Sequence, residues 1–341
     1  MNAAAKPADV ALIVVSFNTR DMLRDCLKTV LIEQELLHSS TGRALQVHVV
    51  DNASHDGSAE MVAAEFPSVR LIRSSVNLGF GPANNRALQT ILNEGHAEYI
   101  VLLNSDAFLH AGALAQAVRQ MEAAPLAGAV GARLVYGDGR WQASARRFHS
   151  VLDDAMVASG LAAKFPRSRF FGRFDRTWAD QNEAAQTDWV PGAFMILRAE
   201  ALRQTGIFDE RFFLYYEEVD LCRRLHAAGW QVWYWPQIVV THLCGESSRT
   251  LHELDYASNE AQVIKWRMRS MMLYYRKHHG AQAWLSMMME RTHMQIIFLR
   301  NRWSRQPWRR TRAQRQASLR ALLRDAWRET QGGRVSPPQP W

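Results

Sequence analysis

The sequence predicts an α/β fold with a mostly parallel central sheet and helices on both of its faces. Short apolar runs rich in β-forming residues recur at 10–15, 45–50, 69–72 and 99–103. Each run ends in a polar loop, and a helical pattern follows, which is typical of parallel strands joined by crossover helices. Because ligands bind at the carboxyl ends of the strands in open α/β sheets, the polar side chains at these ends are the first candidates for a functional site.

The elements follow from apolar periodicity and from turn residues. Asn18 or Thr19 is placed to cap the first helix, 19–37. Gly229 is placed to end the helix predicted over 221–228. The stretch 146–187 has no clear period. Its basic and aromatic segment 164–178 is predicted to be a mobile surface loop, and a lid or a contact to an acceptor phosphate is the alternative. Predicted strands are 10–15, 45–50, 69–72, 99–103, 128–136, 141–143 and 194–197, with short edge strands at 232–235 and 238–241; predicted helices are 19–37, 58–65, 83–92, 112–122, 199–206 and 221–228.

The buried run 99–103 stops at Asn104-Ser105-Asp106. A carboxylate and an amide at the end of a buried strand offer hard oxygen ligands, which suit Mg²⁺ or Mn²⁺ bound together with substrate phosphates. Asn-Ser-Asp is also ordinary turn chemistry, so these residues alone leave both readings open.

A second acidic cluster, Glu217-Glu218-Val219-Asp220, lies at a predicted helix start. One carboxylate there would complement the helix dipole, but three repel one another, and this raises at least one pKa toward the range useful to a general base. His242 ends the last strand pattern, and for a lone histidine a structural role is favoured over metal binding.

A dinucleotide-binding Rossmann domain is disfavoured, because no Gly-x-Gly-x-x-Gly turn follows the first strand. The three cysteines, Cys26, Cys222 and Cys244, indicate neither a disulfide framework nor a zinc site and fit a reducing cytosol. No apolar run is long enough for a signal peptide or a membrane-spanning helix.

Together these motifs resemble the inverting family 2 glycosyltransferases with the GT-A (nucleotide-diphospho-sugar transferase) fold, in particular the bacterial rhamnosyltransferase-like branch. The motifs occur in family order over residues 10–248. They are Ser16-Phe17-Asn18, Asp51-Asn52-x-Ser54-x-Asp56-Gly57-Ser58, Asn77-x-Gly79-Phe80-Gly81 with Asn84-Asn85, Asn104-x-Asp106, Trp189-x-Pro191-Gly192-Ala193, Glu217-Glu218-Val219-Asp220-Leu221 and His242-x-x-Gly245.

The resemblance implies roles for these residues. Asp51 would accept a hydrogen bond from a uracil or thymine. Asp106, Asn104 and His242 would hold the divalent metal at the donor diphosphate, and Glu218 would be the general base, with Glu217 and Asp220 as alternatives. The donor side would also include Asn18, Asn52, Asn77, Gly79 and Asn84, and the acceptor side Trp189, Pro191 and Gly192.

Charge is divided unevenly along the chain. Residues 255–341 hold 17 lysines and arginines against 5 aspartates and glutamates, a balance of +12, whereas the rest of the chain stands at −4. This basic, Met- and Trp-rich segment predicts a helical extension over 255–330 that binds an anionic membrane, packs on the catalytic domain (9–254) or forms a homodimer. Residues 331–341 are predicted to be disordered.

The expected function is transfer of a sugar from a dTDP- or UDP-sugar to a lipid-linked or polysaccharide acceptor, with Mg²⁺ or Mn²⁺. dTDP-rhamnose is the first candidate donor and UDP-galactofuranose an alternative. The expected location is the cytoplasm, on the inner face of the cell membrane. A nucleic-acid-binding protein that stacks Trp303, Trp308 and Trp327 on bases is disfavoured, because it gives the seven ordered motifs no purpose.

Overall fold

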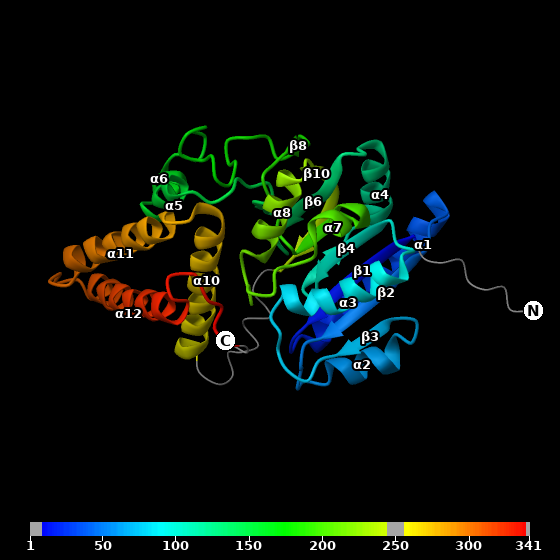
Figure 1. Ribbon diagram of the computed structural model, residues 1–341, viewed down its shortest axis with the longest axis horizontal. Helices are drawn as coiled ribbons and strands as arrows, with labels where there is room; N and C mark the ends of the chain where they lie inside the picture. The colour runs from blue at the N-terminus through cyan, green and yellow to red at the C-terminus, as the bar shows by residue number, and fades with distance from the viewer. Residues whose placement is uncertain (1–8, 244–255, 339–341) are drawn as a thin grey trace, which may run out of the picture.

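The computed structural model describes residues 9–243 and 256–338. Over these residues it contains one ten-stranded sheet in the order β3-β2-β1-β4-β9-β6-β10-β5, with β7 beside β6 and β8 beside β10 (Figure 1). The strands are β1 Val10–Ser16, β2 Leu45–Asp51, β3 Arg70–Arg73, β4 Tyr99–Asn104, β5 Ala107–Leu109, β6 Ala127–Val135, β7 Trp141–Gln142, β8 Ala185–Gln186, β9 Phe194–Arg198 and β10 Gln231–His242.

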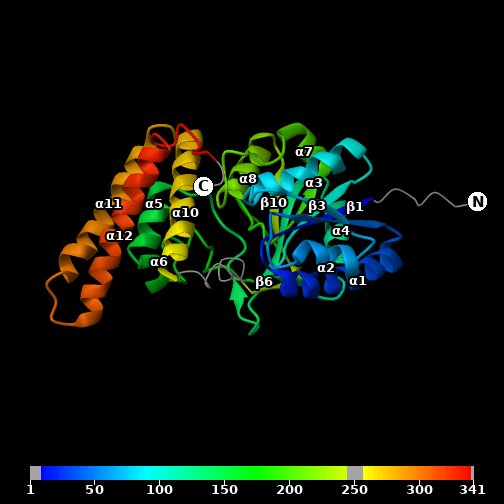
Figure 2. The ribbon, with the colours of Figure 1, turned by 90° about the horizontal axis from the view of Figure 1, so that it is seen from below.

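Helices cover both faces of this sheet, as predicted (Figure 2). Leucines and valines of α1, α2 and α4 are buried against one face, and α3, α7 and α8 are buried against the other. The helices are α1 Arg20–Thr41, α2 Ser58–Glu65, α3 Gly81–Glu94, α4 Ala113–Ala123, α5 Val151–Ala158, α6 Leu161–Lys164, α7 Ala199–Thr205, α8 Glu217–Ala227, α10 Tyr256–His279, α11 Gln282–Asn301 and α12 Pro307–Glu329.

The first strands are parallel, and their register brings the motif residues to one edge. β1 pairs in parallel with β2 and with β4, so Ser16 lies opposite Asp51 and Val15 opposite Asn104. The side chains of β1 and β4 are almost entirely buried, which explains their uninterrupted apolar sequences. The mostly parallel arrangement with flanking helices confirms the predicted fold class.

The last strand differs from the prediction of two short edge strands. β10 is a single strand that lies inside the sheet, between β6 and β5. Its register against β6 shifts between Trp235 and Val239. Pro236 lies in this interval and has no N–H to donate, so the irregularity accommodates it while the strand continues to His242.

The stretch 146–187, predicted as loop without clear elements, contains α5, α6 and β8. Ser150 caps α5 by accepting a hydrogen bond from the backbone N–H of Asp153. Its strand β8 pairs with β10, its helix α5 contacts α11, and the segment supplies several side chains to the site described below.

Helix α10 packs against the catalytic part of the chain rather than standing apart from it. Met268, Met272, Tyr274 and Tyr275 of α10 are buried in the same apolar core as α3 and α8. In both views α11 and α12 extend from α10 away from the sheet (Figures 1 and 2). Over the described residues, no helix is both long and apolar enough to cross a membrane.

The chain end also differs from the prediction of disorder from residue 331. Residues 331–338 form turns packed on α10, where Gly333, at φ +81°, lies so close to Met272 that a Cβ would be 2.1 Å from its carbonyl oxygen. The N–H groups of Arg334 and Val335 donate to the carbonyl oxygen of Thr330. Residues 339–341 and the motif residue Gly245 lie outside the described residues.

Candidate active site

Asn104, Asp106 and His242 lie together at the carboxyl edge of the sheet. β4 ends at Asn104, and Asp106 follows in the turn to β5. β5 pairs antiparallel with the end of β10, with Ala107 opposite His242. This pairing places His242 Nε2 3.4 Å from Asp106 Oδ1 and 3.3 Å from Asn104 Nδ2. Residues about 140 positions apart thus form one polar cluster.

Gln142, on β7, determines how His242 presents its ring. The side-chain Nε2 of Gln142 donates to the backbone carbonyl oxygen of His242, so its Oε1 faces His242 Nδ1 at 3.0 Å. Because an amide oxygen can only accept, the proton of the ring is placed on Nδ1. In the neutral ring, Nε2 then directs its lone pair toward Asp106 and Asn104, as in metal-binding histidines held by an outer partner. The sequence had not indicated Gln142.

The donor set of this cluster fits a divalent cation that also binds phosphate oxygens. Asp106 is buried and supplies a carboxylate, His242 a neutral nitrogen and Asn104 an amide oxygen. Within residues 9–243 and 256–338, no group of three or more His, Cys, Asp or Glu could hold a metal by itself. The remaining ligands would come from a bound diphosphate and water, as is common for Mg²⁺.

Asp51 lies buried at the end of β2, next to the end of β1. Its Oδ2 accepts a hydrogen bond from the backbone N–H of Ser54, whereas its buried Oδ1 has no hydrogen-bond partner in the described part of the chain. An unsatisfied buried acceptor is costly unless a ligand supplies a donor. The imide N–H of a uracil or thymine is such a donor.

Asn18 fastens the loop after β1 to the loop after β2. Its φ is +53°, in the left-handed region that Asn tolerates better than most residues. Its Oδ1 accepts from the backbone N–H of His55, and its own N–H donates to Ser54 Oγ. The two loops therefore form one rigid edge beside Asp51.

The remaining donor-side candidates hold the loop before α3. Asn52 Nδ2 donates to both Asn77 Oδ1 and the carbonyl oxygen of Gly79, each at 2.9 Å. Asn84 is buried, and its Nδ2 donates to the carbonyl oxygen of Phe80. Their polar groups are used within the protein, so they shape the rim of the site.

Gly79 allows this loop to touch the segment that precedes α8. Its φ is +82°, and a Cβ at this position would lie 1.9 Å from the carbonyl oxygen of Phe213. That same oxygen accepts a hydrogen bond from the N–H of Phe80, at 2.8 Å. No side chain other than hydrogen fits, because the two backbones are in direct contact.

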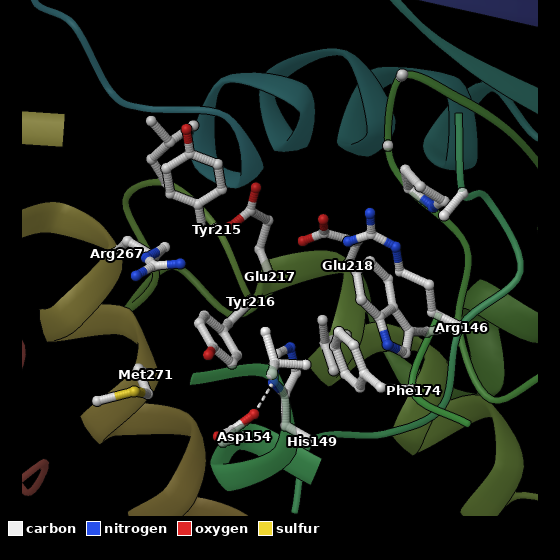
Figure 3. Close-up of a pocket in the computed structure, with 18 of the residues that line it drawn as sticks. Arg146, His149, Asp154, Phe174, Tyr215, Tyr216, Glu217, Glu218, Arg267 and Met271 are labelled. Atoms are coloured by element: carbon white, nitrogen blue, oxygen red, sulfur yellow. Dashed lines mark hydrogen bonds and ion pairs between the residues drawn. The ribbon is translucent and has the colours of Figure 1, made fainter. Parts of the chain in front are cut away.

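Helix α8 begins at the acidic cluster, after a strained turn. Tyr215 and Tyr216 both have a left-handed φ, +68° and +69°. Such a conformation costs on the order of 1–3 kcal/mol per non-glycine residue and persists where the surroundings enforce it, often at functional sites. Here the turn directs Glu217 and Glu218 toward the interior of the site (Figure 3).

Glu217 and Glu218 have different surroundings. Glu217 is buried, and burial together with the neighbouring Glu218 charge raises its pKa well above 4.5. Burial also raises the pKa of Glu218, while backbone hydrogen bonds and the nearby charges of Arg146 and His149 oppose this rise. One carboxyl oxygen of each residue is buried without a hydrogen-bond partner among the described residues. Both are thus available to a ligand proton.

Asp220, the third carboxylate, does not line the cavity but lies between α8 and α10. It is fully buried and lies 2.9 Å from Arg224 Nε, 2.6 Å from Lys277 Nζ and 2.6 Å from His278 Nε2. Burial would raise its pKa, but the hydrogen bonds from His278 and Lys277 outweigh it and hold the pKa below 3.8. Its cations come from α8 and α10, so it ties these two helices together.

One cavity of about 750 Å³ is lined both by Asn104 and His242 of the polar cluster and by Glu217 and Glu218 at the acidic helix start. Figure 3 shows the part of it around the two glutamates. Asn104 and His242 lie at one end, and the backbone of Gly192 comes so close to Phe80 that a Cβ would be 2.9 Å from its ring. The predicted residues that line the cavity are Asn104, Trp189, Pro191, Gly192, Glu217, Glu218 and His242.

The stretch without a readable sequence pattern supplies further lining residues: Arg146, His149, Asp154 and Phe174. The Arg146 guanidinium lies over the Trp189 ring, 5.1 Å from its centre. His149 Nδ1 is 2.9 Å from one oxygen of Asp154, whose other oxygen accepts from the Tyr275 hydroxyl of α10. The sequence shows no periodic pattern for these residues, because they lie in loops and a short helix rather than along one face of a long element.

A sheet of this topology, with a polar cluster and a carboxylate in one cavity at its carboxyl edge, defines a glycosyltransferase of the GT-A type. The structure is similar to PcManGT, a mannosyltransferase from Pyrobaculum calidifontis in complex with GDP-Man and Mn²⁺, with a TM-score of 0.54 and 17% identity over 94% of this chain and 88% of that one.

Sequence comparison gives the family. Residues 11–205 match the model of glycosyl transferase family 2. The chain is 32% identical over 213 residues to the N-acetylglucosaminyl-diphospho-decaprenol L-rhamnosyltransferase of Mycobacterium tuberculosis, which covers 60% of this chain and 69% of the relative. It is 24% identical to rhamnosyltransferase WbbL of Escherichia coli, over 58% of this chain and 69% of that protein. The chain belongs to glycosyl transferase family 2 and is an inverting, rhamnosyltransferase-like enzyme.

Proposed function

We propose that the enzyme transfers rhamnose from dTDP-rhamnose to a sugar carried on a diphosphate-linked lipid. The names of the M. tuberculosis and E. coli relatives support the sugar, and the former supports the lipid diphosphate. The observation that carries the proposal is that Asn104, His242 and Glu218 line one and the same cavity. Galactofuranose from a UDP donor is the alternative.

On the donor side, Asp51 would bind the base through its unpartnered Oδ1. Asn18, Asn52, Asn77, Gly79 and Asn84 would keep the surrounding loops in place. Asp106, His242 and Asn104 would hold Mg²⁺ or Mn²⁺, which, when bound, stabilises the negative charge of the departing diphosphate.

Glu218 is the proposed general base. It lines the cavity, its pKa is raised by burial, and one of its oxygens has no partner in the described structure. A general base must lie within hydrogen-bond reach of the acceptor hydroxyl, so a candidate is judged first by its position and then by its pKa. Glu217 remains the closest alternative, whereas Asp220 does not line the cavity, is held by Arg224, Lys277 and His278, and would serve folding.

The acceptor hydroxyl would lie between Glu218 and the anomeric carbon, against Trp189, Pro191 and Gly192. Glu218 takes the hydroxyl proton as the oxygen forms its bond to the anomeric carbon, while the bond to the diphosphate breaks on the opposite face. A single displacement of this kind inverts the anomeric centre. Trp189, fixed by a hydrogen bond from its Nε1 to the carbonyl oxygen of Arg147, would keep the acceptor aligned.

A lipid-linked acceptor is presented at a membrane, so we infer that the enzyme works at the cytoplasmic face of the cell membrane, as a peripheral protein. The basic extension supports this, since a Lys or Arg near an anionic leaflet contributes about 1 kcal/mol.

A screen of nucleotide sugars with Mg²⁺ or Mn²⁺, by thermal unfolding and donor hydrolysis, tests the proposed donor. At about 100 times its Kd, a true donor adds roughly 2.7 kcal/mol to the free energy of unfolding. dTDP-rhamnose is expected to stabilise the protein in a metal-dependent way. Stabilisation by UDP-galactofuranose but not by dTDP-rhamnose would replace the proposal with its alternative.

A further inference from the structure

The cavity has a second end, away from the polar cluster, walled by three helices outside the central sheet. We call it the helical arm. Its wall consists of Asp154, Val157 and Ala158 of α5, Arg267 and Met271 of α10, and Ser286, Met289 and Glu290 of α11. Arg267 and Met271 are four residues apart, so they share one face of α10. The wall is thus built from helix faces, mainly apolar, with one cation, Arg267, and two carboxylates, Asp154 and Glu290.

In a single displacement the leaving group and the attacking hydroxyl lie on opposite sides of the anomeric carbon, so the donor and the acceptor occupy opposite ends of the cavity. The leaving diphosphate departs toward the cluster of Asn104 and His242, where a metal would hold it. The attacking hydroxyl must approach on the opposite side of the anomeric carbon, next to Glu218. The body of the acceptor therefore extends from Glu218 into the helical arm (Figure 3).

Arg267 is placed to meet an anion in this arm. It is exposed, and no carboxylate lies within ion-pair distance of it in the part of the chain that the structure describes. Figure 3 shows its guanidinium directed from α10 toward the cavity, beside Tyr215. A guanidinium binds phosphate oxygens through two parallel hydrogen bonds, and its charge does not depend on pH near neutrality.

The two carboxylates of the arm do not oppose an anion equally. Asp154 is satisfied by His149 and Tyr275. Glu290 is half-buried and has one buried oxygen without a hydrogen-bond partner among the described residues. Burial raises its pKa, which reduces its negative charge at a given pH, while the nearby Arg267 charge opposes this rise. Its free oxygen suits a sugar hydroxyl.

We propose that the helical arm binds the sugar-phosphate end of a diphosphate-linked lipid acceptor, with Arg267 binding the phosphate and Met271 and Met289 contacting the start of the lipid. This rests on the acceptor class proposed above and assigns it to residues that no sequence motif includes. The C-terminal helices are then part of the acceptor site.

Two acceptors with the same sugar and the same apolar chain test this assignment in detergent solution: one is linked through a diphosphate, and the other is a plain alkyl glycoside. Arg267→Ala is expected to raise the KM for the diphosphate acceptor roughly 10- to 100-fold, the value of a lost charged hydrogen bond. The KM for the alkyl glycoside and for the donor is expected to stay unchanged. Arg267→Lys should recover part of the loss, since it keeps the charge but not the paired hydrogen bonds.

Arg291→Ala is the matched control, because Arg291 is exposed on α11 and does not line the cavity. Equal KM changes for both acceptors in Arg267→Ala, or no change for either, would overturn the assignment while leaving the proposed function intact. A wild-type enzyme that hydrolyses the donor but never glycosylates the diphosphate acceptor would overturn the acceptor class as well. Thermal unfolding of each variant shows whether a loss of activity comes from misfolding.

Discussion

Glu217, Glu218 and Asp220 lie within four positions of one helix turn, yet their surroundings give them different properties. Asp220 is held as an anion by Arg224, Lys277 and a hydrogen bond to His278. Glu217 and Glu218 both line the cavity, but Glu217 is the more buried of the two and packs against Gly81. The chemistry of a carboxylate is set by what surrounds it. The roles of these residues can therefore be separated by isosteric substitution.

Glu218→Gln is expected to lower kcat by at least ~10²-fold while leaving donor affinity unchanged, because it removes only the basic oxygen. Glu217→Gln should lower kcat less. Since burial raises the pKa of Glu218, wild-type activity should rise with pH through a value above 4.5. Steady-state kinetics and donor titration measure these effects. Normal turnover by Glu218→Gln together with an inactive Glu217→Gln would exchange the two roles.

Asp106→Ala is expected to abolish metal-dependent donor binding and turnover without unfolding the protein. Gln142→Leu should weaken metal binding by roughly 10- to 100-fold, because it frees the ring of His242 from its fixed tautomer and orientation. Titration of Mn²⁺ followed by electron paramagnetic resonance, in the presence of donor, measures both. Unchanged Mn²⁺ affinity in Gln142→Leu would contradict the positioning role, and near-normal activity of Asp106→Ala with a chelator would contradict the metal assignment.

At the level of elements, the position of α8 depends on its contact with α10. Besides the Asp220 ion pairs, the Ser270 hydroxyl donates to the carbonyl oxygen of Leu214, and the Tyr216 and Tyr274 rings lie 5.3 Å apart. These contacts hold the strained turn that presents Glu217 and Glu218. The helical extension thus supports the residues that we propose for catalysis.

Asp220→Asn is expected to destabilise the protein by about 3–5 kcal/mol, because Arg224, Lys277 and His278 lose the charge that compensates them. The pKa of Asp220 is lowered in the folded state, so its stabilising contribution is present above pH 3.8 and is lost as pH falls through the folded-state pKa. The wild-type and variant stabilities should therefore converge in acid. Denaturant unfolding over a pH series measures this.

Asp25→Asn is the control, since Asp25 forms an exposed ion pair with Lys28 on α1 and should cost no more than about 0.5 kcal/mol. If the two variants lost equal stability at neutral pH, Asp220 would not be the link between α8 and α10.

At the level of the whole molecule, the connection between α11 and α12 lies farthest from the sheet in both views (Figures 1 and 2). We call this region the hairpin tip. It exposes Ile296, Leu299, Trp303 and Trp308 among basic residues, with the Arg302 and Arg309 guanidinium groups lying over the Trp303 and Trp308 rings. Exposed tryptophans among arginines are typical of surfaces that bind membrane interfaces.

The double variant Trp303→Ala/Trp308→Ala is expected to lose most of its binding to vesicles that contain anionic lipid. Co-sedimentation at low and high salt measures this, and wild-type binding should weaken with salt because surface charges are screened. Trp284→Ala is the matched control: Trp284 is also exposed, at 56%, but lies at the other end of α11. Truncation near residue 254 is unsuitable, because it would remove the buried side chains of α10 from the core.

Equal vesicle binding by the double variant and the wild type would contradict membrane docking by the hairpin tip. A change in oligomeric state instead would indicate a homodimer interface. Salt-sensitive binding of single-stranded nucleic acid that depends on the same tryptophans would favour the nucleic-acid alternative.

Tertiary structure decided several features that local patterns could not indicate. Pro236 and the flanking apolar runs predict two edge strands, but pairing with β5 and β6 makes one interior strand that delivers His242 to Asp106. The stretch 146–187 carries no period, yet it supplies Arg146 and His149 to the cavity. Such placements depend on pairing between segments far apart in the chain, and periodicity reports only on neighbours.

The sequence by itself determined the parallel sheet, the helices on its two faces and the meeting of polar residues at its carboxyl edge. A short buried run of β-forming residues such as 99–103 fits a strand between two neighbouring strands, and a polar residue that ends such a strand lies at the edge of the sheet. Tertiary structure alone decided which carboxylates line the cavity, which glutamine holds His242, and that α10 is part of the core. These outcomes depend on burial and on contacts between distant segments, which are properties of the folded chain rather than of any stretch of it.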